Sequence, residues 1–301
     1  MQFSVLVTRV AEETGLSVTD DAAKIKSWIN EAHRFLCGMR EWAWMMGSGT
    51  IQTTADITNL TAAVDAGGTA VTLSSTVAGS LANDYWIQFS TSDDWYAITA
   101  HTAGTDAVTI SPAYVGSAAL TADACTIRRV YYSAASTADR IIDMYEAIQD
   151  RQLVYVDPRE LDRQVPDPSS TGTPTAYTIL GFDSSNNWRL SFYPIPDTTM
   201  NIQYRYYKKT TDLTNDTDVP QLPEKWHMGI VFVALALFGH PYIDDSRMQS
   251  AEMRARQTVA EMVKQLSPHS DKHAVMQPWD SRGGRRIFGA QFPPDFPQYW
   301  R

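Results

Sequence analysis

Residues 200–266 decide how the rest of the chain is interpreted, and they read MNIQYRYYKKTTDLTNDTDVPQLPEKWHMGIVFVALALFGHPYIDDSRMQSAEMRARQTVAEMVKQL. From Met200 to Lys208, apolar or aromatic residues alternate with mostly polar ones, which predicts a half-buried strand. The following segment, rich in Thr, Asp, Asn and Pro, must be a loop. Pro220 and Pro223 lack the backbone N–H that a strand ladder needs.

An uncharged run follows at Met228–Phe238 and predicts a helix that is buried on every side. A helix of this length spans roughly 16 Å, about half of the apolar thickness of a bilayer, so a membrane-spanning interpretation fails. Gly239 and Pro241 end this helix. Asp245 begins a second, amphipathic helix whose apolar stripe reaches Leu266. We therefore predict a helical hairpin that is docked beside a sheet.

The N-terminal residues predict a short helix and then a long one. Gly15 suits the end of the first helix. The second carries an apolar stripe from Ile25 to Met39 at close to ideal helical spacing, and it ends near Gly47. Its last turns contain Arg40-Glu41-Trp42-Ala43-Trp44. We interpret the two tryptophans as core packing rather than as a ligand platform.

Residues 48–134 contain only short β-type runs, separated by Gly, Asp, Asn and Ser clusters, which predicts a small barrel or sandwich. Residues 51–127 hold seven Asp and no Lys, Arg or Glu, so most of the net charge of −9 lies there. This composition indicates an inserted module. Trp86, Trp95 and Tyr96 could stack against a glycan, but half-buried strand aromatics are the favoured interpretation.

After the module, the apolar stripe of Ile141, Met144, Tyr145 and Ile148 predicts a return to helix from Ser136. Further elements are predicted at 153–156 (strand), 158–164 (helix), 176–182 and 188–193 (hairpin strands).

The predicted fold class is therefore α+β. A helical body, made of a long N-terminal helix plus a C-terminal helical hairpin, carries a small antiparallel sheet and an inserted all-β barrel or sandwich module. The body contains residues 1–47 and 135–266, the module contains 48–134, and 267–301 form an extended C-terminal arm.

The arm has no periodicity but is rich in proline and aromatic residues, whereas a disordered tail normally lacks aromatics. Its residues 282–301 hold four arginines against a single Asp, so the arm is basic on an acidic protein. We interpret it as reaching another subunit or a partner protein. Its candidate docking residues are Arg285, Arg286, Ile287, Phe288, Phe292, Phe296, Tyr299 and Trp300.

Motifs for chemistry are missing from the sequence, which has no HExxH, Walker loop, GxGxxG or GxSxG. His269 and His273 are four residues apart, but they follow the end of a helix, which disfavours a metal pair. Cys37 and Cys125 have no CxxC partner and are expected to be free thiols in a reducing compartment. We expect no catalytic residues, no cofactor and no metal, and Met1–Gly15 does not read as a signal peptide.

Five short motifs occur in a fixed order after residue 150: Pro158-Arg159-Glu160-Leu161, Gly172-Thr173-Pro174, Tyr193-Pro194-Ile195-Pro196-Asp197, Tyr204-Arg205-Tyr206-Tyr207-Lys208-Lys209 and Leu222-Pro223-Glu224. This succession resembles the head-to-tail adaptor, or connector, proteins in the neck of tailed bacteriophages. The long N-terminal helix, closed by residues 40–44, is similar to the opening of adaptors of short-tailed phages. The resemblance covers nearly all of the chain outside 48–134.

The resemblance implies a ring under the portal protein, usually a dodecamer, with genomic DNA passing through its lumen without specific binding. It implies an arm that docks into the portal, contacts with tail or nozzle proteins, no membrane, and assembly in the bacterial cytoplasm. An acidic conduit suits this role because it does not grip phosphates. The alternative is a peripheral tail or baseplate component whose β module binds a host glycan or another virion protein. A virion cell-wall hydrolase is a weaker alternative.

Overall fold

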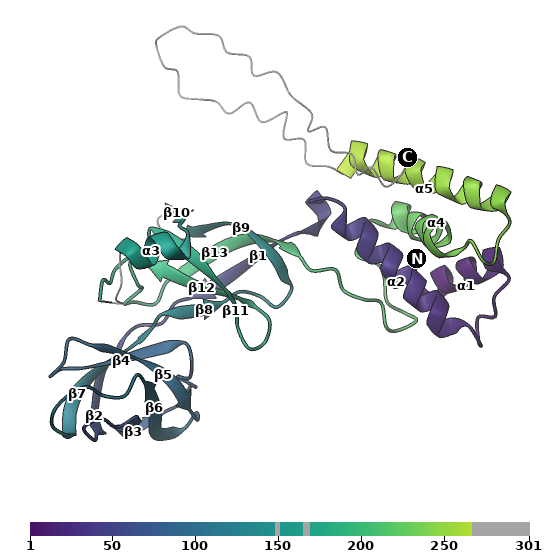
Figure 1. Ribbon diagram of the computed structural model, residues 1–301. Coiled ribbons are helices and arrows are strands. Elements are labelled where there is room, and N and C mark those ends of the chain that lie inside the picture. The colour runs from purple at the N-terminus through teal and green to yellow at the C-terminus, as the bar shows by residue number, and fades with distance from the viewer. Residues whose placement is uncertain (148–150, 165–168, 267–301) are drawn as a thin grey trace, which may run out of the picture. The chain divides into compact units, whose positions relative to one another are not determined.

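The computed structural model describes residues 1–147, 151–164 and 169–266, and the chain divides into two compact units (Figure 1). The helical unit contains Met1–Trp44 and the chain from Asp212 onward, and the β unit contains Met45–Thr211. The chain therefore leaves the helical unit once and returns to it after building the whole β unit.

The helical unit is organised around one apolar helix, α4, which packs against three others (Figure 1). Most side chains of α4 are buried, which explains why its sequence carries no charge. At Gly229, an added Cβ would lie 2.7 Å from Cγ2 of Thr258, so the close approach of α4 to the last helix depends on this glycine. The helices of this unit are α1 (Phe3–Thr14), α2 (Ala22–Gly38), α4 (His227–Phe238) and α5 (Asp245–Leu266), with short 3-10 turns η1 (Ala43–Met45) and η2 (Glu224–Trp226).

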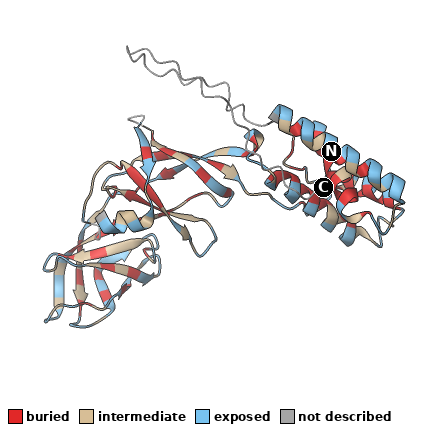
Figure 2. Cartoon of the chain, turned by 45° about the horizontal axis from the view of Figure 1, so that its top comes forward, coloured by how far each residue is buried: buried red, intermediate tan, exposed pale blue. Residues whose placement is uncertain are grey.

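The first sheet of the β unit is a closed barrel with the strand order β2-β3-β6-β5-β4-β7. Alternate residues point inward, so Ile87, Phe89, Tyr96, Ile98 and Ile127 form part of a continuous buried core (Figure 2). Closure leaves no open strand edge within the barrel. The strands are β2 (Ile57–Val64), β3 (Ala70–Val77), β4 (Tyr85–Phe89), β5 (Trp95–His101), β6 (Thr105–Ser111) and β7 (Leu120–Arg129).

The second sheet has seven strands in the order β1-β13-β9-β10-β11-β12-β8. Neighbouring strands are antiparallel except for β10 and β11, which are parallel and are connected through a short helix, α3 (Pro158–Gln164). One face of the sheet holds the core, which includes Met144, Leu153, Phe192 and Ile202. The strands are β1 (Met46–Gln52), β8 (Tyr131–Ser133), β9 (Ala138–Glu146), β10 (Arg151–Tyr155), β11 (Ala176–Phe182), β12 (Trp188–Tyr193) and β13 (Asn201–Lys208).

The predicted fold class was wrong. In the part of the chain that the structure describes, two sheets dominate, only 29% of the residues are helical and the helices are short, so there is no body made of a long N-terminal helix plus a C-terminal hairpin. The predicted boundaries of body, module and arm stay a prediction. Strands β1 and β8, near the two ends of the predicted module 48–134, are the two edge strands of the seven-stranded sheet, and the barrel lies between them in sequence.

The predicted helix from Ser136 is in fact strand β9, and two bulges explain the error. In the pairing of β9 with β13, Asp139 and Ile142 have no partner, so the register shifts twice. Each bulge adds one residue to the strand and moves the next inward position from two to three residues along. Ala138, Ile141 and Met144 are therefore buried at a spacing of three, which imitates the period of a helix.

Candidate assembly interface

The predicted arm lies outside the described residues, so its candidate contacts stay a prediction. These residues are Arg285, Arg286, Ile287, Phe288, Phe292, Phe296, Tyr299 and Trp300. Within residues 1–147, 151–164 and 169–266, no group of three or more His, Cys, Asp and Glu side chains could hold a metal ion. None of the helices in the described part of the chain is long and apolar enough to cross a membrane.

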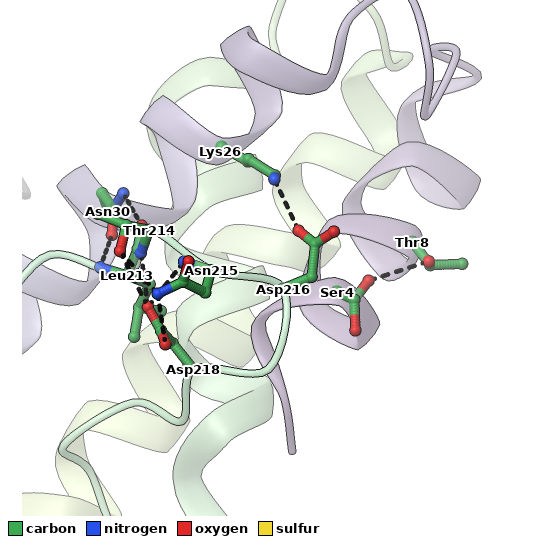
Figure 3. Close-up of polar contacts among 9 residues, drawn as sticks. All are labelled: Ser4, Thr8, Lys26, Asn30, Leu213, Thr214, Asn215, Asp216 and Asp218. Carbon is green, nitrogen blue, oxygen red and sulfur yellow. Dashed lines mark hydrogen bonds and ion pairs between the residues drawn. The ribbon is translucent and has the colours of Figure 1, made fainter.

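The loop before α4 is fastened to the first two helices (Figure 3). Asn30 of α2 pairs with the backbone of Leu213, donating from Nδ2 to the carbonyl at 3.0 Å and accepting the N–H at 2.8 Å. Lys26 forms an ion pair of 2.6 Å with Asp216, whose carbonyl accepts the N–H of Ser4 at 3.0 Å. The loop thus satisfies free donors at the start of α1 and holds α1 and α2 together.

Two histidines are buried beside this loop. His33 of α2 is fully buried, and its Nε2 accepts the backbone N–H of Gln221 at 3.3 Å. Burial lowers its pKa from 6.5 to about 4. His227 is 1% exposed, its Nε2 contacts the carbonyl of Leu222 at 2.8 Å, and burial lowers its pKa as well. The His33 ring is therefore neutral at pH 7, and both histidines act as packed, structural side chains.

In the β unit, a charged cluster connects the barrel to the seven-stranded sheet. Asp84, in the loop before β4, forms ion pairs with Arg129 at 3.6 Å and Arg189 at 3.7 Å. Its carbonyl also accepts the N–H groups of Val130 and Tyr131 at 2.9 and 3.2 Å. Burial nevertheless raises the pKa of the Asp84 carboxyl, because desolvation outweighs the attraction of the two arginines.

A second ion pair lies at the start of the barrel, where Asp56 directly precedes β2. Arg128 of β7 forks onto the carboxylate of Asp56, with Nε at 3.0 Å and Nη2 at 2.7 Å from Oδ2. Both side chains are largely buried, at 9% and 13% exposed. The guanidinium also lies 4.6 Å from the ring centroid of Trp95 and donates to the carbonyl of Ser169 at 3.4 Å.

These contacts decide the role of the barrel aromatics. Tyr96 is 1% exposed and belongs to the barrel core. Trp95 lies against Arg128, and Trp86 is only partly exposed. Two of the three rings considered for glycan stacking are thus engaged inside the protein, and no observation favours the glycan-binding alternative.

The seven-stranded sheet has one long open edge, formed by β1. β1 pairs only with β13 in the described sheet, and it has seven residues with neither a proline nor a charged side chain. Gly49 has no room for a Cβ, which would lie 2.5 Å from Cζ of Tyr204, and at Gly47 the gap to Tyr206 would be 3.0 Å. The two glycines allow the tyrosine rings to lie across the strand.

Sequence reasoning missed this edge and both ion clusters. The Gly47-x-Gly49 pattern and the Tyr204-x-Tyr206 pattern share a period of two, which is a signal for facing strands. Similarly, Arg128 and Arg129 are the first cations after residues 51–127, which contain neither Lys nor Arg. They were therefore the nearest candidates to pair with the carboxylates of that segment.

A model of the SU10 adaptor protein family matches residues 102–282, which is more than half of the chain. The match begins directly after β5 and includes barrel strands β6 and β7, strands β8 to β13 of the other sheet, and helices α4 and α5. No curated protein matches the chain. The match defines the class as a bacteriophage head-to-tail adaptor, a structural component of the virion.

The chain belongs to the SU10 adaptor protein family. This confirms the resemblance that we drew from the ordered motifs after residue 150. An adaptor of this family is a structural phage protein that interacts with other virion proteins. Helices α1 and α2 precede the matched range, so the similarity of residues 40–44 to adaptors of short-tailed phages stays a prediction.

Proposed function

We propose that the protein forms the ring-shaped adaptor under the portal of a tailed phage, where it provides a conduit for DNA and a surface for tail attachment. The family match over residues 102–282 carries this proposal. We expect a dodecamer that is assembled in the host bacterial cytoplasm, joins the portal on one side and meets tail or nozzle proteins on the other.

The charge of the protein supports a conduit. With a net charge of −9, the chain has no general attraction for phosphates, so DNA can pass during ejection without being retained. The arm differs from the rest of the chain because four arginines face one Asp in residues 282–301. We propose that its basic and aromatic residues contact neighbouring virion subunits, which include the portal.

The test is native mass spectrometry with negative-stain images of the full-length protein, alone and after mixing with the portal protein of the same phage. The expected result is a closed ring with a mass of about twelve times 33.6 kDa. A chain that stays monomeric in the presence of portal would contradict the proposal. Portal mixed with an unrelated acidic protein of similar charge is the control for nonspecific association.

A further inference from the structure

We propose that the open edge of β1 is the docking site for residues 285–292 of a neighbouring copy, which add to the seven-stranded sheet as an eighth strand. This inference deepens the proposed function, since it rests on the chain forming a ring of identical subunits.

The free backbone groups of β1 can be assigned by alternation. The N–H of Thr53 bonds to the carbonyl of Met200 at 2.9 Å, which fixes the direction toward β13. Because bonding directions alternate along a strand, Gly49 and Ile51 also point toward β13. The N–H groups of Ser48, Thr50 and Gln52 then point to the open edge. Among the described residues, no other segment accepts a backbone hydrogen bond from them.

The two edges of the sheet differ in how they are protected. The opposite edge strand, β8, has only three residues, and short edges are poor templates for pairing. β1 has seven residues, and the side chains of Ser48, Thr50 and Gln52, which are exposed on one face of the sheet, are uncharged. A long edge without lysine or proline is the kind that accepts an extended segment by strand addition.

The arm contains one segment of matching length. Residues 285–292 read RRIFGAQF, lie after Gly283-Gly284 and precede Pro293-Pro294. Its Ile287, Phe288 and Phe292 are residues that favour strands, and a short segment of this kind bounded by Gly and Pro is typical of a strand. Residues 267–284 separate it from α5 and, when extended, can reach on the order of 60 Å. Phe296, Tyr299 and Trp300 follow the prolines and stay available for a portal contact.

Symmetry favours the arm over a second copy of β1 as the occupant. Two β1 edges that pair with each other form a two-fold contact, which closes a dimer and cannot continue around a ring. An arm that pairs with the edge of the next copy forms a head-to-tail contact, which closes when the rotation allows. Only the second arrangement fits a ring that is built from one chain.

The experiment is hydrogen–deuterium exchange of the full-length assembled protein, followed by mass spectrometry of the peptides that cover β1. The expected result is that the backbone amides of Ser48, Thr50 and Gln52 exchange more slowly in the assembled protein, on the order of tenfold or more, than in a chain whose arm cannot pair. A chain with both Gly289→Pro and Ala290→Pro, which removes donors in both bonding directions, should lose this protection. The control with Gly289→Ala and Ala290→Ser keeps both N–H groups and should retain it.

The edge is tested by a second matched pair. Thr50→Pro removes one outward N–H without removing a bond to β13, and proline is tolerated on such edges. Thr50→Ala keeps that N–H. We expect Thr50→Pro to abolish the protection at Ser48 and Gln52, whereas Thr50→Ala leaves it intact because recognition is through the backbone.

Mixing the two proline variants tests whether the contact is between copies. The Thr50→Pro chain has an intact arm, and the double-proline chain has an intact edge, so protection should return only on the edge of the double-proline chain. The two β1 peptides differ in mass and can be followed separately.

Protection that is absent from the full-length ring, or that survives the arm substitutions, would overturn the inference. A ring that forms with an unprotected edge leaves the proposed function standing, and a portal mixture with no ring removes the function itself.

Discussion

Acidification should destabilise the helical unit through His33. This side chain is fully buried, and burial lowers its pKa from 6.5 to about 4. Among its charged neighbours, Asp212 raises the pKa, whereas His227 and Arg34 lower it further, and burial has the largest effect. The folded protein therefore holds the neutral ring, while the unfolded chain takes up a proton near pH 6.5.

The sign of the effect follows from proton binding. Because the pKa is lower in the folded state, the contribution of His33 to stability is fully present above pH 6.5 and is lost as the pH falls toward 4. At 1.36 kcal/mol per pKa unit, the full loss is about 3 kcal/mol. By the same linkage relation, about 2 kcal/mol is lost by pH 5. Burial also lowers the pKa of His227, which adds to the loss in the same direction.

The assay is urea unfolding of the full-length protein at pH 7, 6 and 5, followed by tryptophan fluorescence. The unsubstituted chain should lose about 2 kcal/mol or more between pH 7 and pH 5. His33→Gln, which keeps an acceptor for the N–H of Gln221, should show a flatter pH profile, with His227 responsible for the remainder. His240→Gln is the control because His240 is exposed. Equal pH slopes for His33→Gln and the unsubstituted chain would refute the reasoning.

Two further predictions concern the β unit. Gly49→Ala should lower the free energy of unfolding by about 2 kcal/mol because the new Cβ meets a buried tyrosine ring, whereas Gly79→Ala, with open space around it, should change it by less than about 0.5 kcal/mol; equal effects in thermal unfolding would contradict the packing at β1. Asp56→Asn should cost about 3 kcal/mol because it withdraws the counter-charge from the buried Arg128. Asp84→Asn should lower the free energy of unfolding by less than about 1 kcal/mol because burial already disfavours its charge. A larger loss for Asp84→Asn than for Asp56→Asn in chemical unfolding would contradict this account of the two ion pairs.

Local patterns predicted the elements whose environment is uniform along the chain. The uncharged run in α4 gave a buried helix because most of its side chains pack against α1, α2 and α5, although Leu237 is exposed. The alternation over β13 gave a half-buried strand because that strand has one core face and one exposed face. In both elements, the spacing of buried residues along the sequence matches the regular geometry of the helix or strand. The secondary structure can therefore be predicted without knowing which elements pack against it.

Strand β9 shows where local reading fails. Its bulges at Asp139 and Ile142 exist only opposite the residues of β13, more than fifty positions later. Without that partner, buried residues at a spacing of three are read as a helix, and a strand with bulges has no other local signature. This one error moved a central strand of the seven-stranded sheet into a helical body and so contributed to the wrong fold class.

The candidate interface was hidden for the same reason. Taken alone, Gly47 and Gly49 look like turn residues. Their reason appears only when Tyr206 and Tyr204 lie opposite them, and these tyrosines follow in the sequence only after all the barrel strands. The segment without Lys, Arg or Glu runs from residue 51 to residue 127. The boundary between the two sheets lies elsewhere, because β1 and β8 on either side of the barrel belong to the seven-stranded sheet. A charge pattern can therefore locate the acidic barrel, but only pairing shows that β1 belongs to the other sheet. Its edge is open because that sheet, unlike the barrel, does not close.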